Sequence, residues 1–109
     1  MTARLATSVL AGAIIRKAEA EGGFAAVLAK GDPTAGAILL LLTERGSAPC
    51  VLERLLRPDG SYTWAAPIAE SAQVPEFVAR RRRFDPDLWV IELDVPSAKR
   101  FTDEMSGFD

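Results

Sequence analysis

The side chains best suited to chemistry or binding are gathered between positions 80 and 92. Four consecutive arginines precede two aspartates that flank a proline, and an apolar segment with a tryptophan and a glutamate follows. Arginine and aromatic side chains are the usual anchors of protein interfaces. We therefore expect a candidate interaction or salt-bridge corner formed by Arg80, Arg81, Arg82, Arg83, Asp85, Asp87, Trp89 and Glu92.

Within this corner, helical spacing gives one arginine a special position. Arg81 follows Phe77 by four residues and Val78 by three, so a helix places it beside the apolar face. A guanidinium in that position needs a carboxylate partner, and a bidentate pair would lock the helix to a strand. The nearby candidates are Asp85, Asp87, Glu92 and Asp94.

The four arginines also suggest a phosphate-binding patch. Four successive helical residues, however, point around most of the helix, so they do not form one continuous surface. The chain has a net charge of -2, and four phosphate contacts would give a salt slope of only about -3.6. We keep weak nucleic-acid binding through Arg80 to Arg83 as a second alternative and regard nucleic acid as an unlikely partner.

Two acids near the end of the same segment could support another chemistry. One residue separates Glu92 from Asp94, so a strand places both carboxylates on one face, roughly 6 to 7 Å apart. Such a pair could bind a hard metal ion or act in a hydrolase. Because no third ligand or nucleophile is evident, a carboxylate-based enzyme or metal-binding protein is the first alternative, and we expect no metal or cofactor.

The composition removes several common mechanisms. The sequence has no histidine and one cysteine, Cys50, so it cannot form a Ser-His-Asp triad, an internal disulfide or a cysteine zinc site. No apolar run approaches the roughly 18 residues of a membrane-spanning helix. These features favour a small, non-catalytic, cytoplasmic interaction module with an unknown protein partner or with self-association, and with no membrane contact.

The elements that carry these residues can be placed from periodicity and turn signals. A helix is expected over Thr7 to Glu21, capped by the Thr7 hydroxyl. Two apolar runs, 24–29 and 37–43, flank the turn cluster at 31–34 and look like a hairpin. Residues 38–42 are apolar on both faces, which is typical of a central strand.

The second half of the chain predicts another hairpin, a helix and a last strand. Strand 50–56 turns at 58–60, and the return strand places Tyr62, Trp64, Ala66 and Ile68 on one face. A helix over Ser71 to Arg83 has Pro75 in its first turn. Strand 88–93 then alternates Trp89, Ile91 and Leu93 against Leu88, Val90, Glu92 and Asp94.

Together these elements predict an α+β fold in one domain, residues 1–109. A mostly antiparallel sheet of about five strands is covered by two helices, in the order helix, four strands, helix, strand. The last strand returns after a helix, so part of the pairing is allowed to be parallel. After Pro96 we expect a short turn or helix around Phe101, with residues 105–109 frayed.

Several segments also resemble a known family. They are residues 22–28, 30–33, 35–37 and 82–92, and the Phe-Asp-Pro-Asp-Leu-Trp block at 84–89 is the most specific of them. The sequence resembles the uncharacterised bacterial domain-of-unknown-function family 1491 over nearly its whole length. That resemblance implies a bacterial source and a small cytoplasmic single-domain protein, and it implies no activity or catalytic residues.

Overall fold

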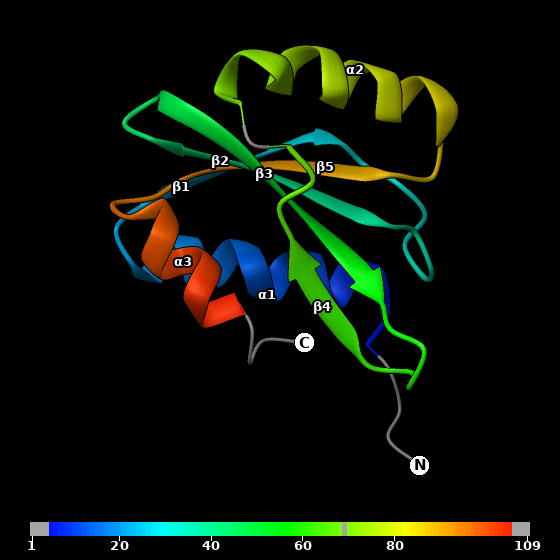
Figure 1. Ribbon diagram of the computed structural model, residues 1–109. Helices are drawn as coiled ribbons and strands as arrows, with labels where there is room; N and C mark the ends of the chain where they lie inside the picture. The colour runs from blue at the N-terminus through cyan, green and yellow to red at the C-terminus, as the bar shows by residue number, and fades with distance from the viewer. Residues whose placement is uncertain (1–4, 69, 106–109) are drawn as a thin grey trace.

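A five-stranded sheet lies between helices on its two faces. The computed structural model describes residues 5–68 and 70–105. Helix α2 covers one face of the sheet, and α1 and α3 cover the other (Figure 1). The predicted α+β class is therefore confirmed, with three helices where two were expected.

The elements follow the predicted order, with one helix added at the end. Their bounds are α1 Thr7–Ala20, β1 Phe24–Ala29, β2 Ile38–Glu44, β3 Ser47–Leu56, β4 Tyr62–Ala65, the 3-10 turn η1 Ser71–Gln73, α2 Val74–Phe84, β5 Trp89–Asp94 and α3 Ala98–Met105.

The strand order is β1-β5-β2-β3-β4, and β5 runs antiparallel to β1 but parallel to β2. The predicted hairpin between runs 24–29 and 37–43 is therefore wrong, because β5 separates the two strands. A strand that is apolar on both faces is most stable between two neighbours, and β5 buries four of its six residues. The remaining pairings are antiparallel, so the sheet is mostly antiparallel as expected.

Two tight turns connect β2, β3 and β4. Arg45 and Gly46 both have positive φ, 52° and 77°, which matches the right-handed twist of the β2–β3 hairpin. The predicted second hairpin is confirmed by the antiparallel β3–β4 pair, and Gly60 has φ 89° in its turn. Since β2 lies in the middle of the sheet, its predicted central position is confirmed as well.

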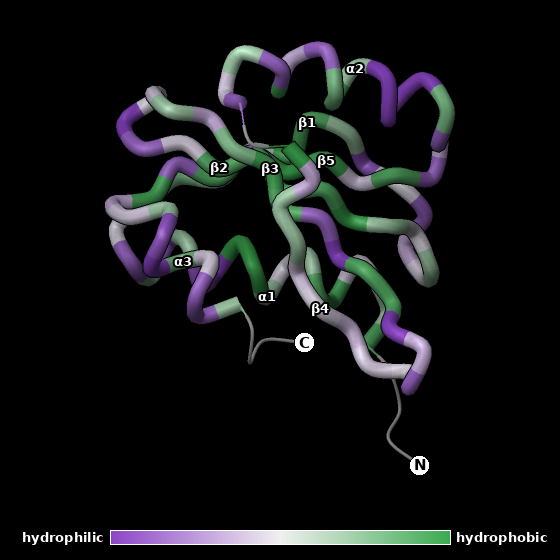
Figure 2. The backbone as a smooth tube through the Cα atoms, in the orientation of Figure 1, coloured by the Kyte–Doolittle hydropathy of each residue, from purple (hydrophilic) through white to green (hydrophobic). Residues whose placement is uncertain are grey.

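The sheet separates two apolar cores, and the alternation of β5 divides its residues between them. Trp89, Ile91 and Leu93 face α1 and α3, where they join Leu10, Ile14 and Phe101 in the larger core. Val90 faces α2 and joins Leu39, Val51, Val74 and Val78 in the smaller one. Figure 2 shows the apolar stretches concentrated on the strands between the helical layers.

The ends of the first two helices differ from the prediction. Ala6 precedes α1, and the Thr7 hydroxyl does not cap the helix but donates to the carbonyl oxygen of Gly36, 2.9 Å away. The predicted helix 71–83 is a 3-10 turn followed by α2, with Pro75 in the first turn of α2 as expected. In the described ranges, none of the helices is long and apolar enough to cross a membrane.

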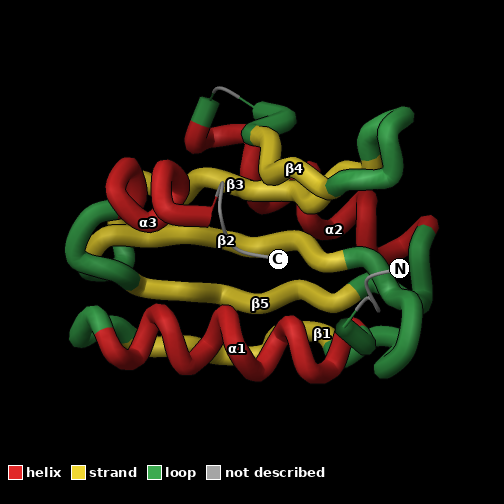
Figure 3. The backbone as a smooth tube through the Cα atoms, turned by 90° about the horizontal axis from the view of Figure 1, so that it is seen from below, coloured by secondary structure: helices red, strands yellow, loops and turns green. Residues whose placement is uncertain are grey.

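The last helix, α3, completes the larger core. Phe101 and Met105 are fully buried, so the short helix expected around Phe101 is confirmed and extends to Met105. Met105 is therefore packed, and the rest of the tail predicted to fray, residues 106–109, lies outside the described residues. Figure 3 shows α1 lying along β1 and β5, with α3 beside β2 and β3.

Strand β4 is shorter than the predicted return strand, because it ends at Ala65. Trp64 packs against the core under α1 and α3, whereas Ile68 packs against the core under α2. The expected single-faced row from Tyr62 to Ile68 is therefore wrong, since the chain leaves the sheet and crosses to the other side before Ile68.

Candidate functional site

The four arginines of the predicted corner do not act together. Arg80 pairs with Glu76 one helical turn earlier, at 3.2 Å, and both side chains are exposed. Arg81 pairs with Glu53 on β3, which joins α2 to the sheet. Arg82 and Arg83 are exposed on the last turn of α2. In this part of the structure only Arg81 has the locking role that its helical position predicts.

The partner of Arg81 corrects the sequence prediction, which considered only acids between positions 85 and 94. Leu39 of β2 pairs with Glu53 on one side and with Val90 on the other, so Glu53 is level with the first half of β5. Glu92 is further along β5, and the carboxylate of Asp85 instead accepts from the backbone N–H of Asp87 at 3.1 Å. Glu53 precedes Arg81 by 28 residues, so only strand register could have revealed the pair.

Trp89 has a structural position. It is 5% exposed, and its indole Nε1 donates to the backbone carbonyl of Asp32 at 2.8 Å. A side chain held in the core in this way cannot be an exposed aromatic anchor. The exposed aromatic group of this corner is Phe84, which is 77% exposed, with the Arg83 guanidinium 5.7 Å from its ring centre.

The β1–β2 loop and the α2–β5 loop pack on one another. The N–H of Asp32 donates to the carbonyl of Asp87 at 3.0 Å. A Cβ on Gly31 would come within 2.0 Å of that same carbonyl oxygen, and one on Gly36 within 2.4 Å. Only glycine permits so close an approach, so the glycine-rich segment and the Phe-Asp-Pro-Asp-Leu-Trp block form one structural unit.

The start of α1 is attached to the same loop. The N–H groups of Thr7 and Ser8 donate to the carbonyls of Thr34 and Pro33, at 3.1 and 2.9 Å. Within the loop, the Asp32 carboxylate accepts from the N–H groups of Thr34 and Ala35. Two amides at the helix start, which have no acceptor within the helix, are thus satisfied by the loop.

A pocket of about 350 Å³ lies between this loop, the start of α1 and the β3–β4 hairpin. The Arg54 guanidinium lines it and lies 3.6 Å from the ring centre of Tyr62. Sequence reasoning missed this pocket, because its walls come from distant segments. The described residues that line it are Leu5, Thr7, Thr34, Ala35, Gly36, Ala37, Ile38, Arg54, Leu56 and Tyr62.

The acid pair expected on β5 lines a different hollow. Glu92 and Asp94 border a cavity of about 280 Å³ together with Phe24 and Thr43. Across residues 5–68 and 70–105, no cluster of three or more acidic, cysteine or histidine side chains could hold a metal ion. Burial raises the pKa of the Cys50 thiol above its ordinary value, which disfavours the thiolate.

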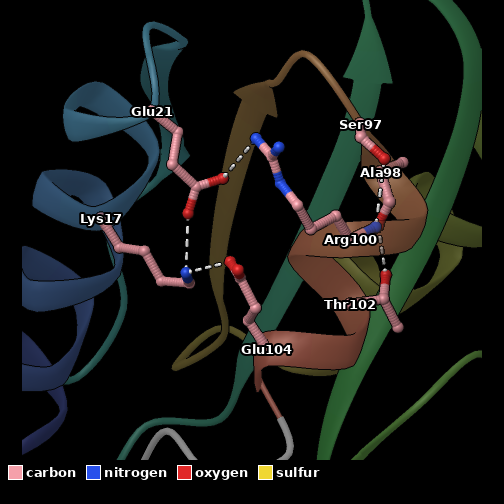
Figure 4. Close-up of polar contacts among 7 residues, drawn as sticks. All are labelled: Lys17, Glu21, Ser97, Ala98, Arg100, Thr102 and Glu104. Carbon is pink, nitrogen blue, oxygen red and sulfur yellow. Dashed lines mark hydrogen bonds and ion pairs between the residues drawn. The ribbon is translucent and has the colours of Figure 1, made fainter.

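A polar cluster joins α1 and α3, the two helices that cover the larger core. Lys17 of α1 contacts Glu21 and, on α3, Glu104, each at 2.7 Å, and Arg100 lies 3.8 Å from Glu21 (Figure 4). Burial by itself lowers the pKa of Lys17. The hydrogen bonds and charges of Glu104 and Glu21 together raise it by more than burial lowers it, so the pKa of Lys17 lies above its ordinary value. The Lys17 ammonium lowers the pKa of Glu104. This cluster holds α3 in place.

The outer edge of β1 carries apolar side chains that are exposed, in contrast to the packed apolar side chains of the interior. In the described sheet, β1 has β5 on one side and no strand on the other. Its sequence, Phe-Ala-Ala-Val-Leu-Ala, has no charged residue. Phe24 is 76% exposed, Val27 45% and Leu28 41%.

Comparison with known proteins identifies the family. The family model described as "Protein of unknown function (DUF1491)" matches residues 5–103. The chain belongs to the DUF1491 family. A crystal structure of a DUF1491 protein from Caulobacter crescentus CB15 is 33% identical and superposes with a TM-score of 0.82, covering 90% of this chain and 94% of that one.

Two further solved structures agree with this assignment. The NMR structure of a DUF1491 protein from the same bacterium is 32% identical, with a TM-score of 0.81 and coverage of 92% of this chain and 94% of that chain. The solution structure of protein Atu0922 from A. tumefaciens is 28% identical, with a TM-score of 0.76 and coverage of 91% and 92%. No curated protein matches significantly. The DUF1491 resemblance noted in the sequence is therefore confirmed.

Proposed function

We propose that this DUF1491 protein is a non-catalytic, cytoplasmic interaction module that self-associates by joining β1 strands of two copies. The observation that carries the proposal is the exposed, uncharged β1 edge. A lone cysteine suits the reducing conditions of the cytoplasm. The chemistry is recognition through backbone hydrogen bonds and apolar contacts.

Soluble proteins normally protect the outer strands of a sheet from pairing with other chains. The usual means are lysine or proline on the edge, inward-pointing charge, a short strand or a bulge. Within residues 24–29 the sequence supplies no charge and no proline, and only a register shift between Val27 and Ala29 interrupts the ladder. The opposite edge, β4, has four residues, none of them fully exposed. The contrast between the two edges of the sheet favours β1 as the edge that pairs with a strand of another chain.

A second copy of the chain suits this edge because β1 is self-complementary. In antiparallel pairing about a twofold axis, opposite residues share a face, so Ala26 can oppose Ala26 of the second copy. Val27 then opposes Ala25 of the other copy, twice in the dimer, within the part of β1 that precedes the register shift. Apolar side chains thus pack across the axis on either side of a small pair, and no like charges meet.

Two phenylalanines of equal exposure provide the test. We expect Phe24→Lys to abolish concentration-dependent dimerisation in analytical ultracentrifugation, because it places a charge on the edge strand. Phe84→Lys makes the same change on α2, at 77% exposure against 76%, and serves as the matched control that leaves dimerisation intact. A wild-type protein that stays monomeric at high micromolar concentration would contradict the proposal.

The arginine corner remains a second candidate surface, favoured by the exposed Phe84 beside Arg83. Its exposed cations Arg80, Arg82 and Arg83 would suit an acidic partner. The same pair of variants separates the two surfaces. Association lost in Phe84→Lys and kept in Phe24→Lys would move the interaction site to the corner.

A further inference from the structure

We infer that the hollow beside Glu92 and Asp94 binds a small organic amine as its ammonium ion. This hollow has a volume of about 280 Å³, and its described walls come from β1, β2, β5 and the turn after β2. In Figure 1 that turn extends to the left past the end of α2. The inference rests on an unpartnered buried hydroxyl, on two carboxylates without a cation, and on the strand register that brings them together.

The register of three strands places the polar side chains of the hollow next to one another. Val90 faces α2, so Glu92 and Asp94, two and four residues further along β5, lie on the same face of the sheet. Thr43 of β2 is the parallel partner of Asp94, one strand spacing of about 4.8 Å away. On the other side of β5, Ala26 is paired with Glu92, and its small side chain leaves room for a ligand.

The Thr43 side chain is the observation that points to a ligand. It is 6% exposed and lines the hollow. Within residues 5–68 and 70–105, its hydroxyl makes no hydrogen bond, yet the oxygen is not sealed in the interior, so a group in the hollow can reach it. Buried polar groups are normally hydrogen-bonded, and a buried hydroxyl without a partner is costly. A donor placed in the hollow satisfies it.

The two carboxylates set the charge of the ligand. Glu92 and Asp94 are partly buried, and neither forms an ion pair with any residue that the structure describes. Arg45 borders a neighbouring hollow together with Asp94, but its side chain is exposed and is not paired with that acid. An ammonium group has three donors and no acceptor, which matches two carboxylates and one hydroxyl. Phe24, also in the lining, is 76% exposed and offers an aromatic face of the kind that attracts organic cations.

An organic amine suits the hollow better than a metal ion does. Calcium takes about six to eight oxygen ligands. In the described part of the chain, no group of three or more acidic, cysteine or histidine side chains is placed to hold a metal. The volume is just below the roughly 300 Å³ of the smallest usual ligand sites, which limits the amine to a short carbon chain. The inference goes beyond self-association, because its contacts are side chains on the sheet face and not the backbone edge of β1.

Three probes test the charge and the kind of ligand. Butylamine, butanol and calcium chloride are titrated into the wild-type protein at pH 7 and constant ionic strength, and amide chemical shifts are followed by NMR. We expect butylamine to shift the amides of residues 24–26, 43–46 and 92–94 saturably, and to bind at least about tenfold more tightly than butanol or calcium. Binding of the amine no tighter than that of either other probe, or amine shifts centred outside these segments, would overturn the inference.

A matched pair of glutamate variants tests the site. Glu92→Gln keeps the shape of the side chain and should weaken butylamine binding about tenfold, because a charge-assisted hydrogen bond is lost. Glu19→Gln makes the same change at an exposed position of α1, on the other side of the sheet, and should change the affinity less than about twofold. Equal weakening by both variants would show attraction by net charge alone and would overturn the site.

A further variant tests the hydroxyl. Thr43→Val removes the hydroxyl at nearly constant shape and should weaken butylamine binding about fivefold, because one hydrogen bond is lost. Unchanged affinity in a variant whose amide spectrum remains well dispersed would contradict the three-acceptor site. Self-association is measured by sedimentation without any amine, so failure of these titrations leaves the β1 proposal intact.

Discussion

Among four consecutive arginines, position on the helix decides which one contributes to the fold. Arg81 faces the sheet and meets Glu53, and both side chains are partly buried. Arg80 pairs with an exposed glutamate on its own helix, and Arg82 is exposed. A pair removed from water leaves a costly unpaired charge when one partner is lost, whereas exposed pairs contribute little.

We therefore expect Arg81→Ala to lower the free energy of unfolding by about 2 kcal/mol, and Arg82→Ala to change it by less than about 0.5 kcal/mol. Urea denaturation of both variants gives the comparison. A double-mutant cycle with Glu53→Ala should show a coupling energy of roughly 1 kcal/mol. Equal small losses for the two arginine variants would exclude the lock.

At the scale of elements, α3 is a short helix held by both apolar and polar contacts. Phe101 and Met105 enter the core, and Glu104 joins Lys17 on α1. An isolated helix of eight residues is not stable in water, so these tertiary contacts provide its stability. The ion pair links the stability of this layer to pH.

The sign of that dependence follows from Glu104, whose pKa is lowered in the folded protein by the hydrogen bond from Lys17. Its contribution is fully present above the unfolded glutamate pKa of about 4.3 and is lost as pH falls through the folded value. The raised pKa of Lys17 keeps the partner charged well beyond neutral pH. We expect Glu104→Gln to be less stable than wild type at pH 7, with a smaller difference at pH 3.

Chemical denaturation of both proteins at these two pH values measures the difference. Asp103→Asn is a control on the exposed side of α3, where the pairing with Lys99 lies within one helix. A pH-independent difference between wild type and Glu104→Gln would show that the helix is held by packing alone.

At the scale of the whole molecule, the last strand in the sequence is near the middle of the sheet. In the described sheet, β1 has β5 as its one strand partner, and β2 depends on β5 along its parallel side. The residues of β5 also contribute to both cores. The sheet therefore cannot be assembled until β5, near the end of the chain, is available to pair with β1 and β2. Pairing between strands so distant in the sequence slows folding.

We expect a fragment of residues 1–85, which contains four of the five strands, to show no cooperative thermal unfolding and a poorly dispersed amide NMR spectrum. The full chain measured under the same conditions is the control. Native-like dispersion of the fragment would mean that β1 and β2 can pair directly, as the sequence alone suggested.

Much of the local structure could be predicted because its signals are local. The apolar run of β2 predicts a central strand, Pro75 marks the first turn of α2, and the alternation of β5 assigns its faces. The absence of histidine limits the available chemistry. The DUF1491 segments also identify the family, but no activity follows from it.

Tertiary structure decided which distant segments meet. Periodicity shows which face of a strand is buried, but strand order depends on backbone pairing across the whole chain, so the insertion of β5 between β1 and β2 could not be read from either run. For the same reason, the partners of Arg81 and Trp89 and the walls of the Arg54 pocket became visible only in the folded chain. The sequence determined the elements and their faces, and long-range packing decided what those faces touch.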